Sequence, residues 1–148
     1  MAREDSSSDT ILLDLFQTNQ LRERLIAAAV EGLELPSEDY PFYVLIGAEG
    51  PLTPTALAAR TQMPLSTVLY RVGRLERRGH VEREPNPEDR RSYLLGLTRE
   101  GQKLLRDARP RFRALAEAVE GRLGGGVAGL RAGLGELREA IETELSRD

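Results

Sequence analysis

Apolar residues recur every three or four positions at the start of the chain, and this spacing predicts an amphipathic helix over about 10–33, with Asp9 as its N-cap. Its apolar stripe comprises Ile11, Leu12, Leu15, Phe16, Leu25, Ile26, Ala29 and Leu33. One small domain cannot cover so long a stripe, so we expect a second element or a second chain to pack against it. A second helix is expected over about 38–49, capped by Ser37.

Two further helices are predicted close together. Thr53 is a typical N-cap for a short helix over about 54–60, and a turn at 61–64 leads to a helix over about 65–78. The longer helix has one apolar face, made of Leu65, Val68, Leu69, Val72 and Leu75. The remaining positions are polar or basic. Two helices joined by a short turn in this way are typical of a helix-turn-helix, although a solvated cationic face is the alternative.

The next segment favours the helix-turn-helix. Residues 80–84 and 92–97 have the patterns of short strands, while 85–91 hold two prolines and an asparagine and predict a charged, turn-rich tip. A hairpin with a long polar tip directly after the second helix is the order of a winged helix-turn-helix. We expect the lone His80 to be a partly exposed spacer rather than a metal ligand.

Two helices are expected in the last third of the chain. Thr98 should cap the first of them, and Pro110 should bend or divide it. The last helix is expected over about 127–146 and follows a glycine-rich segment.

The expected fold class is mainly α with a small β-hairpin wing. We treat 1–148 as a single domain with a winged helix-turn-helix lobe over 36–97 and a helical dimerisation region made of 9–35 and 98–148. The terminal helices carry more apolar surface than the lobe can use. A homodimer on a palindromic DNA site explains that surface, and an intramolecular bundle is the alternative.

Basic residues are concentrated in one segment, although the net charge of the chain is −3. Residues 1–59 carry three basic and ten acidic groups, whereas 60–91 carry eight arginines and five acidic groups. Arginine binds phosphates and guanine edges with two hydrogen bonds, so double-stranded DNA is the expected partner. The chain has only one lysine, so it prefers arginine throughout, and the use of arginine rather than lysine is weak evidence for DNA binding. The clustering of the arginines in one segment is better evidence.

Several classes of function are excluded or disfavoured. The chain has no cysteine, which removes disulfides, thiol chemistry and cysteine-based zinc sites. No apolar stretch is long enough for a membrane span and no signal peptide is recognisable, so a cytoplasmic protein without membrane contact is expected. A single histidine and no metal-ligand spacing leave little for an enzyme, and no cofactor or metal is expected.

The segment LTPTALAARTQMPLSTVLYRVGRLERRGHVEREPNPEDRRSYLLGLTREG resembles the MarR family of bacterial transcriptional regulators. The shared motifs are S-T-V at 66–68, R-L-E-x-x-G at 74–79, D-R-R at 89–91 and L-T-x-x-G at 97–101. The resemblance implies a homodimer whose terminal helices interlock. It also implies that the recognition helix enters the major groove and that a wing arginine, Arg90 or Arg91, enters the minor groove beside Asp89. The implied DNA-binding residues are Ser66, Thr67, Tyr70, Arg71, Arg74, Asp89, Arg90 and Arg91.

Many members of this family respond to small aromatic acids or phenols. Four aromatic residues are candidates for such a ligand site, with core packing as the alternative for each: Phe16, Tyr40, Phe42 and Tyr43. The expected function is a sequence-specific DNA-binding transcriptional regulator, most often a repressor in this family, released by such a ligand. The alternative is a winged-helix protein-interaction module that binds no operator.

Overall fold

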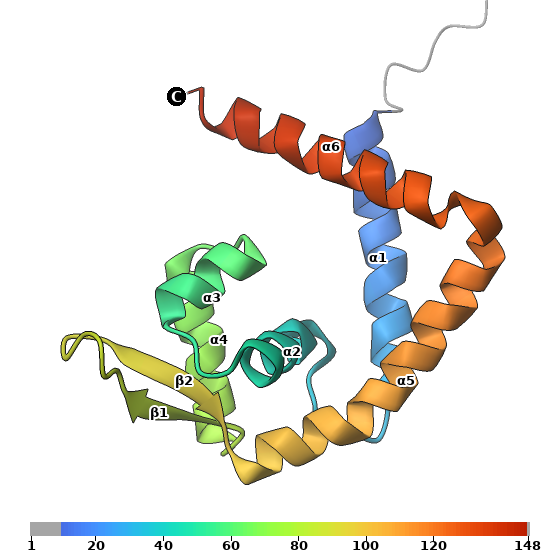
Figure 1. Ribbon diagram of the computed structural model, residues 1–148. Helices are drawn as coiled ribbons and strands as arrows, with labels where there is room; N and C mark the ends of the chain where they lie inside the picture. Colours follow the sequence, from blue (N-terminus) through green and yellow to red (C-terminus); the bar gives the residue numbers. More distant parts are fainter. Residues whose placement is uncertain (1–9, 148) are drawn as a thin grey trace, which may run out of the picture. The chain divides into compact units, whose positions relative to one another are not determined.

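The computed structural model describes residues 10–147, which form helices and one antiparallel β-hairpin (Figure 1). In chain order the elements are α1 (Ile11–Ala29), the 3-10 helix η1 (Ser37–Asp39), α2 (Tyr40–Glu49), α3 (Pro54–Thr61), α4 (Leu65–Arg77), β1 (Val81–Pro85), β2 (Tyr93–Leu97), α5 (Arg99–Leu123), the 3-10 helix η2 (Gly124–Gly126) and α6 (Val127–Leu145). The chain divides into two compact units, one ending at Phe112 and one beginning at Arg113. The predicted fold class, mainly α with a hairpin wing, is confirmed.

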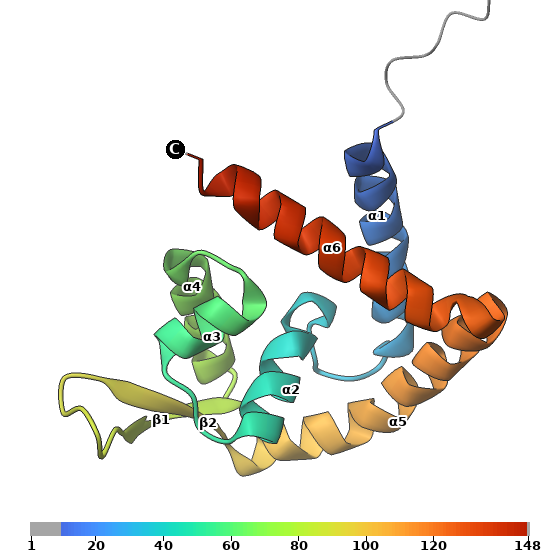
Figure 2. The same cartoon turned by 45° about the horizontal axis from the view of Figure 1, so that its top comes forward.

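The core of the first unit lies around α2. Figure 2 shows α2 with α3 and α4 on one side and the first half of α5 on the other. Fully buried side chains come from α2, α3, α4 and β2: Phe42, Tyr43, Leu57, Val68, Leu75 and Leu95. Each such side chain contributes about 1.5–3 kcal/mol when it leaves water, so this cluster fixes the helix-turn-helix and the wing as one body.

Side-chain caps set where three of the helices begin. The Oγ1 of Thr53 accepts a hydrogen bond from the Ala56 N–H at 3.1 Å, and the Oγ1 of Thr98 accepts one from the Gly101 N–H at 3.1 Å. Both predicted caps are therefore confirmed. Asp9 lies outside the described residues, and the cap of α1 is Thr10, whose Oγ1 accepts from the Leu13 N–H at 3.4 Å.

The prediction that Ser37 caps α2 is wrong. Residues Ser37–Asp39 form a 3-10 turn, closed by a hydrogen bond from the Asp39 N–H to the Pro36 carbonyl at 3.0 Å, and α2 begins at Tyr40. A helix capped by Ser37 would need a hydrogen bond from residue 41 to the carbonyl of residue 37. Pro41 has no N–H to donate, so a helix capped by Ser37 would lack its first backbone hydrogen bond.

Pro110 was expected to bend or divide its helix, and the division is wrong, because α5 continues through Pro110. Residues on both sides of Pro110 are held by the first unit. Ala108 is fully buried, and the Arg111 guanidinium donates to the Glu31 carbonyl at 2.8 Å. The Phe112 ring stacks on Tyr40 with a centroid distance of 3.4 Å. These contacts offset the one backbone hydrogen bond that proline removes.

The first and last helices present apolar side chains to solvent. Neither α1 nor α6 contains a buried residue. Their large apolar side chains with at least a third of their surface exposed are Ile11, Leu12, Phe16, Leu21, Leu25, Leu130, Leu134, Ile141 and Leu145. Within the described residues, no helix is long and apolar enough to cross a membrane.

Candidate nucleic-acid interface

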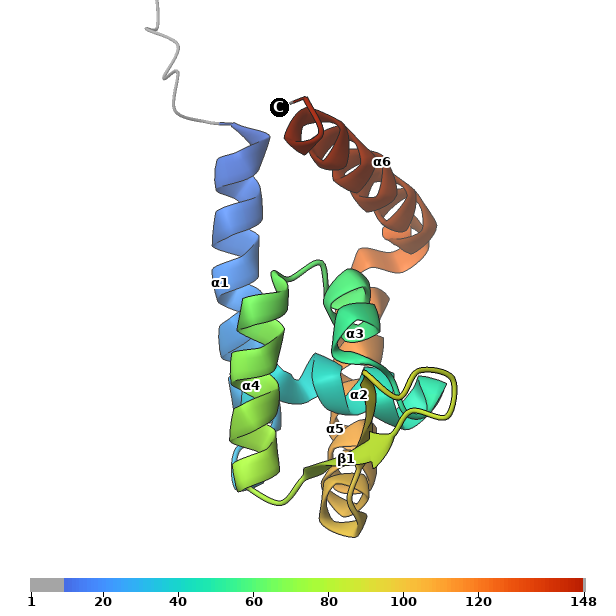
Figure 3. The same ribbon diagram turned by 90° about the vertical axis from the view of Figure 1, so that its left-hand side faces the viewer.

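Helix α4, the second helix of the helix-turn-helix, lies next to α3 and α2 (Figure 3), and it has one buried face and one outward face. Val68, Val72 and Leu75 are at most 1% exposed and define the buried face. At 3.6 residues per turn, Tyr70 and Arg77 lie about 170° from the centre of that face. Tyr70 is 66% exposed. Leu65 and Leu69, which were expected in the apolar face, lie at its edge and are 43% and 42% exposed, because the flank on which they lie is not covered.

The outward face therefore differs in part from the predicted site. Ser66 and Tyr70 are exposed on it and Thr67 is half-buried at its margin. Arg77, which sequence reasoning did not select, is exposed at its centre. Its position could have been found from helical periodicity alone, because residue 77 follows 66, 70 and 73 at helical spacing.

Arg71 lies closer to the buried face, and the Nη1 of its guanidinium is hydrogen-bonded within the protein. Its Nη1 donates to the Asp39 Oδ1 at 3.1 Å and to the Glu38 carbonyl at 2.9 Å. Arg74 lies beside it, with its Nη2 3.4 Å from Glu38 Oε1 and 3.9 Å from Asp39 Oδ2. These contacts join α4 to the turn that precedes α2. We call Glu38, Asp39, Arg71 and Arg74 the acid–arginine cluster.

Asp39 is the centre of the acid–arginine cluster. Its side chain is completely buried, and its Oδ2 has no hydrogen-bond partner. Burial raises the pKa of this carboxyl, while the neighbouring Arg71 and Arg74 act to lower it. A buried carboxylate is tolerated where cations face it, so Asp39 depends on the arginines of the recognition helix.

A second polar contact joins α2 to the end of α4. The Tyr43 hydroxyl and the His80 Nδ1 are 2.7 Å apart, and both side chains are at most 3% exposed. The expectation that His80 is a partly exposed spacer is therefore wrong, because the residue packs inward as Gly79 turns the chain into β1. Burial and the nearby Arg78 lower the pKa of His80, and burial raises that of Tyr43.

The wing is fixed to the recognition helix by a charged contact. In the antiparallel hairpin, Val81 pairs with Leu97 and Pro85 pairs with Tyr93. The Arg83 guanidinium donates to the two carboxylate oxygens of Glu76 at 2.6 and 3.0 Å. The same guanidinium lies 4.4 Å from the centroid of the Tyr93 ring. Arg83 is thus a structural cation that links β1 to α4.

The wing tip presents two arginines without acidic partners among the described residues. Arg90 and Arg91 are both exposed. The Asp89 Oδ1 accepts a hydrogen bond from the backbone N–H of Arg91 at 2.9 Å, which holds the turn rather than the guanidinium. Asn86 makes a similar turn with the Glu88 N–H at 3.0 Å. Both arginine side chains remain available to an anionic partner.

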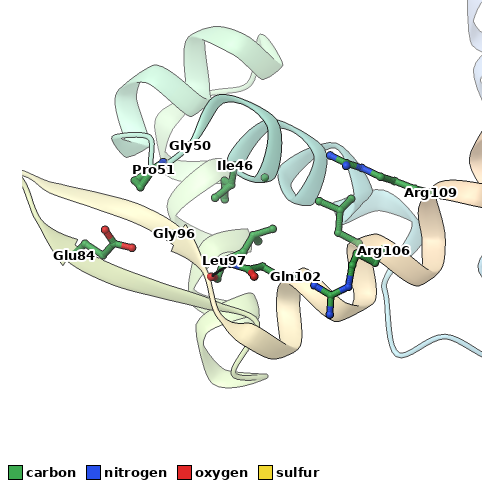
Figure 4. A pocket seen from close by; sticks show the side chains of 11 residues that line it. Ile46, Gly50, Pro51, Glu84, Gly96, Leu97, Gln102, Arg106 and Arg109 are labelled. Carbon is green, nitrogen blue, oxygen red and sulfur yellow. Dashed lines mark hydrogen bonds between the residues drawn. The ribbon is translucent and has the colours of Figure 1, made fainter.

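The four aromatic candidates for a ligand site are not brought together. Phe42 and Tyr43 are completely buried, Tyr40 is half-buried against Phe112, and Phe16 is 61% exposed on α1. A hollow of about 350 Å³ lies elsewhere, between the end of α2, the hairpin and the first half of α5 (Figure 4). Its charged and apolar walls include Ile46, Glu84, Leu97, Leu105, Arg106 and Arg109. No group of three or more metal-ligating side chains occurs in residues 10–147.

Comparisons with known proteins agree with this geometry. The sequence profile of the MarR family matches residues 42–92. The transcriptional regulator HosA of Escherichia coli O111:H- is 34% identical over 95 residues, which cover 62% of this chain and 70% of HosA. The match to the multiple antibiotic resistance protein MarR of Salmonella typhimurium, at 29% identity, covers 59% of this chain and 60% of that protein's length. These relatives are transcription factors and not enzymes.

Two solved structures share the fold over most of the chain. A mutant MarR from E. coli complexed with operator DNA has a TM-score of 0.78 at 25% identity, covering 86% of this chain and 94% of that one. The PcaV regulator from Streptomyces coelicolor, in complex with its natural ligand, has a TM-score of 0.77 at 25% identity and covers 96% of this chain and 98% of that one.

Proposed function

This chain belongs to the MarR family of transcriptional regulators, and we propose that it binds DNA sequence-specifically and represses transcription from a palindromic operator. The observation that carries the proposal is the exposed face of α4, which ends in Arg77, together with a wing whose Arg90 and Arg91 have no acidic partner among residues 10–147. A helix inserted into the major groove and a cation in the minor groove are the contacts that this arrangement offers.

The proposed contacts divide by position. Ser66, Thr67 and Tyr70 contact base edges or phosphates from the first half of α4. Arg74, whose contacts to Glu38 are long at 3.4–3.5 Å, turns to the DNA. Arg71 keeps its Nη1 on Asp39 and offers its remaining N–H groups to a phosphate. On the wing, Arg90 or Arg91 enters the minor groove, and Asp89 holds the turn from which they project.

The proposed active form is a homodimer that works in the cytoplasm. The exposed apolar side chains of α1 and α6 support it, since water does not favour such surface on two helices of one chain. A two-fold dimer places two recognition helices about 34–36 Å apart, which matches two half-sites of a palindrome. Sedimentation equilibrium gives the mass directly, and a monomer at micromolar concentration would contradict this part.

The proposed release is by a small aromatic or phenolic ligand, the class that the family resemblance implies, and it is supported by the PcaV regulator, a similar fold solved in complex with its natural ligand. Of the four predicted aromatic residues, Phe16 is exposed and Tyr40 is half-buried against Phe112. Phe42 and Tyr43 belong to the core, where a ligand would have to open the packing. Adding benzoate or phenol at millimolar concentration to the DNA complex tests the two ligand chemistries.

Fluorescence anisotropy tests the DNA proposal. The protein is titrated with the duplex upstream of its own gene and with a scrambled duplex, each at two salt concentrations. Tighter binding to the upstream duplex, weakening as salt rises, is the expected result, because contacts to phosphates release counterions. Equal binding to both duplexes would contradict specificity for that site. Binding to neither would favour the protein-interaction module.

A further inference from the structure

Three helices of the first unit contain an interior glycine, and the protein itself explains two of them. A Cβ on Gly47 in α2 would lie 2.5 Å from the Leu105 Cδ2, and a Cβ on Gly101 in α5 would overlap the His80 carbonyl. In both places a bare backbone lets two elements of the unit approach closely. The glycines are therefore required by packing.

The third interior glycine, Gly73 in α4, has no such reason inside the chain. A Cβ there would meet no atom nearer than the Arg77 Nη1 at 3.4 Å, which is ordinary contact with the flexible end of a side chain. The φ angle of Gly73 is not positive, so its backbone is that of a regular helix. Glycine makes a helix interior less stable than alanine does. The recognition helix is thus weakened at this residue with no gain in packing.

The place of Gly73 points to a partner outside the chain. At 3.6 residues per turn it lies about 130° from the buried face, between Tyr70 one turn before it and Arg77 one turn after it. Tyr70 is 66% exposed, and both neighbours have long side chains. Without a side chain at this position, the helix backbone is covered only by the flexible end of Arg77, whose Nη1 would lie 3.4 Å from an added Cβ. Another molecule that displaces this end can reach the backbone.

We propose that Gly73 is a specificity-determining residue at which the edge of a base pair is seated against the backbone of α4, between Tyr70 and Arg77. This inference rests on the proposed function, in which α4 enters the major groove. A helix with its side chains is about 10–12 Å wide, and the groove is about 12 Å wide. Because the helix nearly fills the groove, one methyl group added on the side of α4 that faces the base pairs keeps the helix from reaching the floor of the groove.

The flanking residues fit this role. The Tyr70 hydroxyl can donate or accept a hydrogen bond, and the Arg77 guanidinium has no acidic partner among the described residues. Arg77 can donate two hydrogen bonds to guanine or bind a phosphate at the rim of the groove. A base edge differs between sequences, whereas a phosphate does not. A contact between a base edge and Gly73 therefore raises the affinity for operator DNA more than the affinity for other DNA.

Gly73→Ala tests the inference, with Gly129→Ala as the matched control. Gly129 is also helical and lies about 130° from the apolar stripe of α6. A Cβ added to Gly129 would have no atom within 4 Å. Each substitution should raise the melting temperature by about 2–4 °C, because alanine is the better helix residue. Gly73→Ala should weaken binding to the upstream duplex by about tenfold or more, as overpacking does.

The same variant should bind the scrambled duplex within about twofold of the unmodified protein, and Gly129→Ala should leave both affinities unchanged. Unchanged operator binding by Gly73→Ala would overturn the inference, and so would an equal loss on both duplexes, which would indicate a phosphate contact. A lower melting temperature for Gly73→Ala would show that the protein itself needs the glycine. If the unmodified protein binds neither duplex, the proposed function fails first and the inference with it.

Discussion

The contact between Asp39 and Arg71 should stabilise the first unit only as a pair. Three variants separate the charges from their interaction: Asp39→Leu, Arg71→Met and the two substitutions together. The Asp39 side chain has no exposed surface, and the Arg71 Nη1 lies 3.1 Å from its Oδ1. Removing one partner leaves the other charge buried, and broken buried pairs cost about 3–5 kcal/mol of the free energy of unfolding.

The structure places the two single losses at and below the lower end of that range. Arg71 keeps 23% of its side-chain surface exposed, so water partly solvates the guanidinium that remains in Asp39→Leu, and the loss is about 3 kcal/mol. In Arg71→Met the carboxylate still faces Arg74 at 3.9 Å, so the loss is smaller, about 2 kcal/mol. The double variant replaces the pair by apolar side chains, of which Leu has the same branching as Asp, and should lie within about 1 kcal/mol of the unmodified protein.

Urea denaturation at one fixed protein concentration, followed by far-ultraviolet circular dichroism, measures these differences. Because the single losses are about 3 and 2 kcal/mol and the double variant stays within about 1 kcal/mol, a coupling energy of at least about 4 kcal/mol is expected from the cycle. Losses that add within about 0.5 kcal/mol would refute the reasoning. The folded double variant also tests Arg71 against DNA. Retained operator binding would assign Arg71 to positioning the helix, and a loss of tenfold or more would assign it to direct contact.

Three further predictions concern the wing, the buried histidine and the last helix. Arg91→Ala should weaken operator binding by about 1–3 kcal/mol and reduce the salt slope by about one, with the dimer mass unchanged in sedimentation; an unchanged slope would exclude a phosphate contact. The pKa of His80 lies below its ordinary 6.5 in the folded state, so its contribution to stability is present above that pH and declines as the pH falls below it. His80→Gln should remove this decline from urea titrations, whereas an identical pH profile would show that the imidazole does not contribute. A chain ending at Gly121 lacks α6 and should lose the dimer, so a soluble truncated dimer in sedimentation would show that α6 is dispensable.

The local signals in the sequence were sufficient for the helix-turn-helix and the wing. Thr53 and Thr98 cap helices where their side chains predicted, because an N-cap is decided within three residues of itself. The turn before α4 also follows from Pro64, and the tip of the wing follows from Pro85, Asn86 and Pro87. Ser37 failed as a cap because Pro41, four residues later, removes the N–H that the helix would need.

Contacts between distant segments were not predictable from one sequence. Asp39 and Arg71 are 32 residues apart, and Tyr43 and His80 are 37 residues apart. Helical periodicity placed Arg71 among the polar residues of its helix, but periodicity does not say which neighbouring element supplies an acid. The same limit explains why Phe42 and Tyr43 were candidates for a ligand site, since an aromatic residue in a pocket and one in a core have the same sequence signal.

Two adjacent residues at the start of α2 connect the recognition helix to α5. Asp39 holds Arg71 of α4, while Tyr40 stacks on Phe112 of α5 in nearly parallel planes. Peptide geometry keeps the two Cα atoms about 3.8 Å apart, so the two contacts cannot shift independently by more than their side chains allow. A displacement of α5 at Phe112 that preserves the stack must therefore move Asp39. When Asp39 moves, either α4 moves with it or the contact between Asp39 and Arg71 breaks. The second outcome costs more free energy, because it leaves a buried carboxylate without its cation.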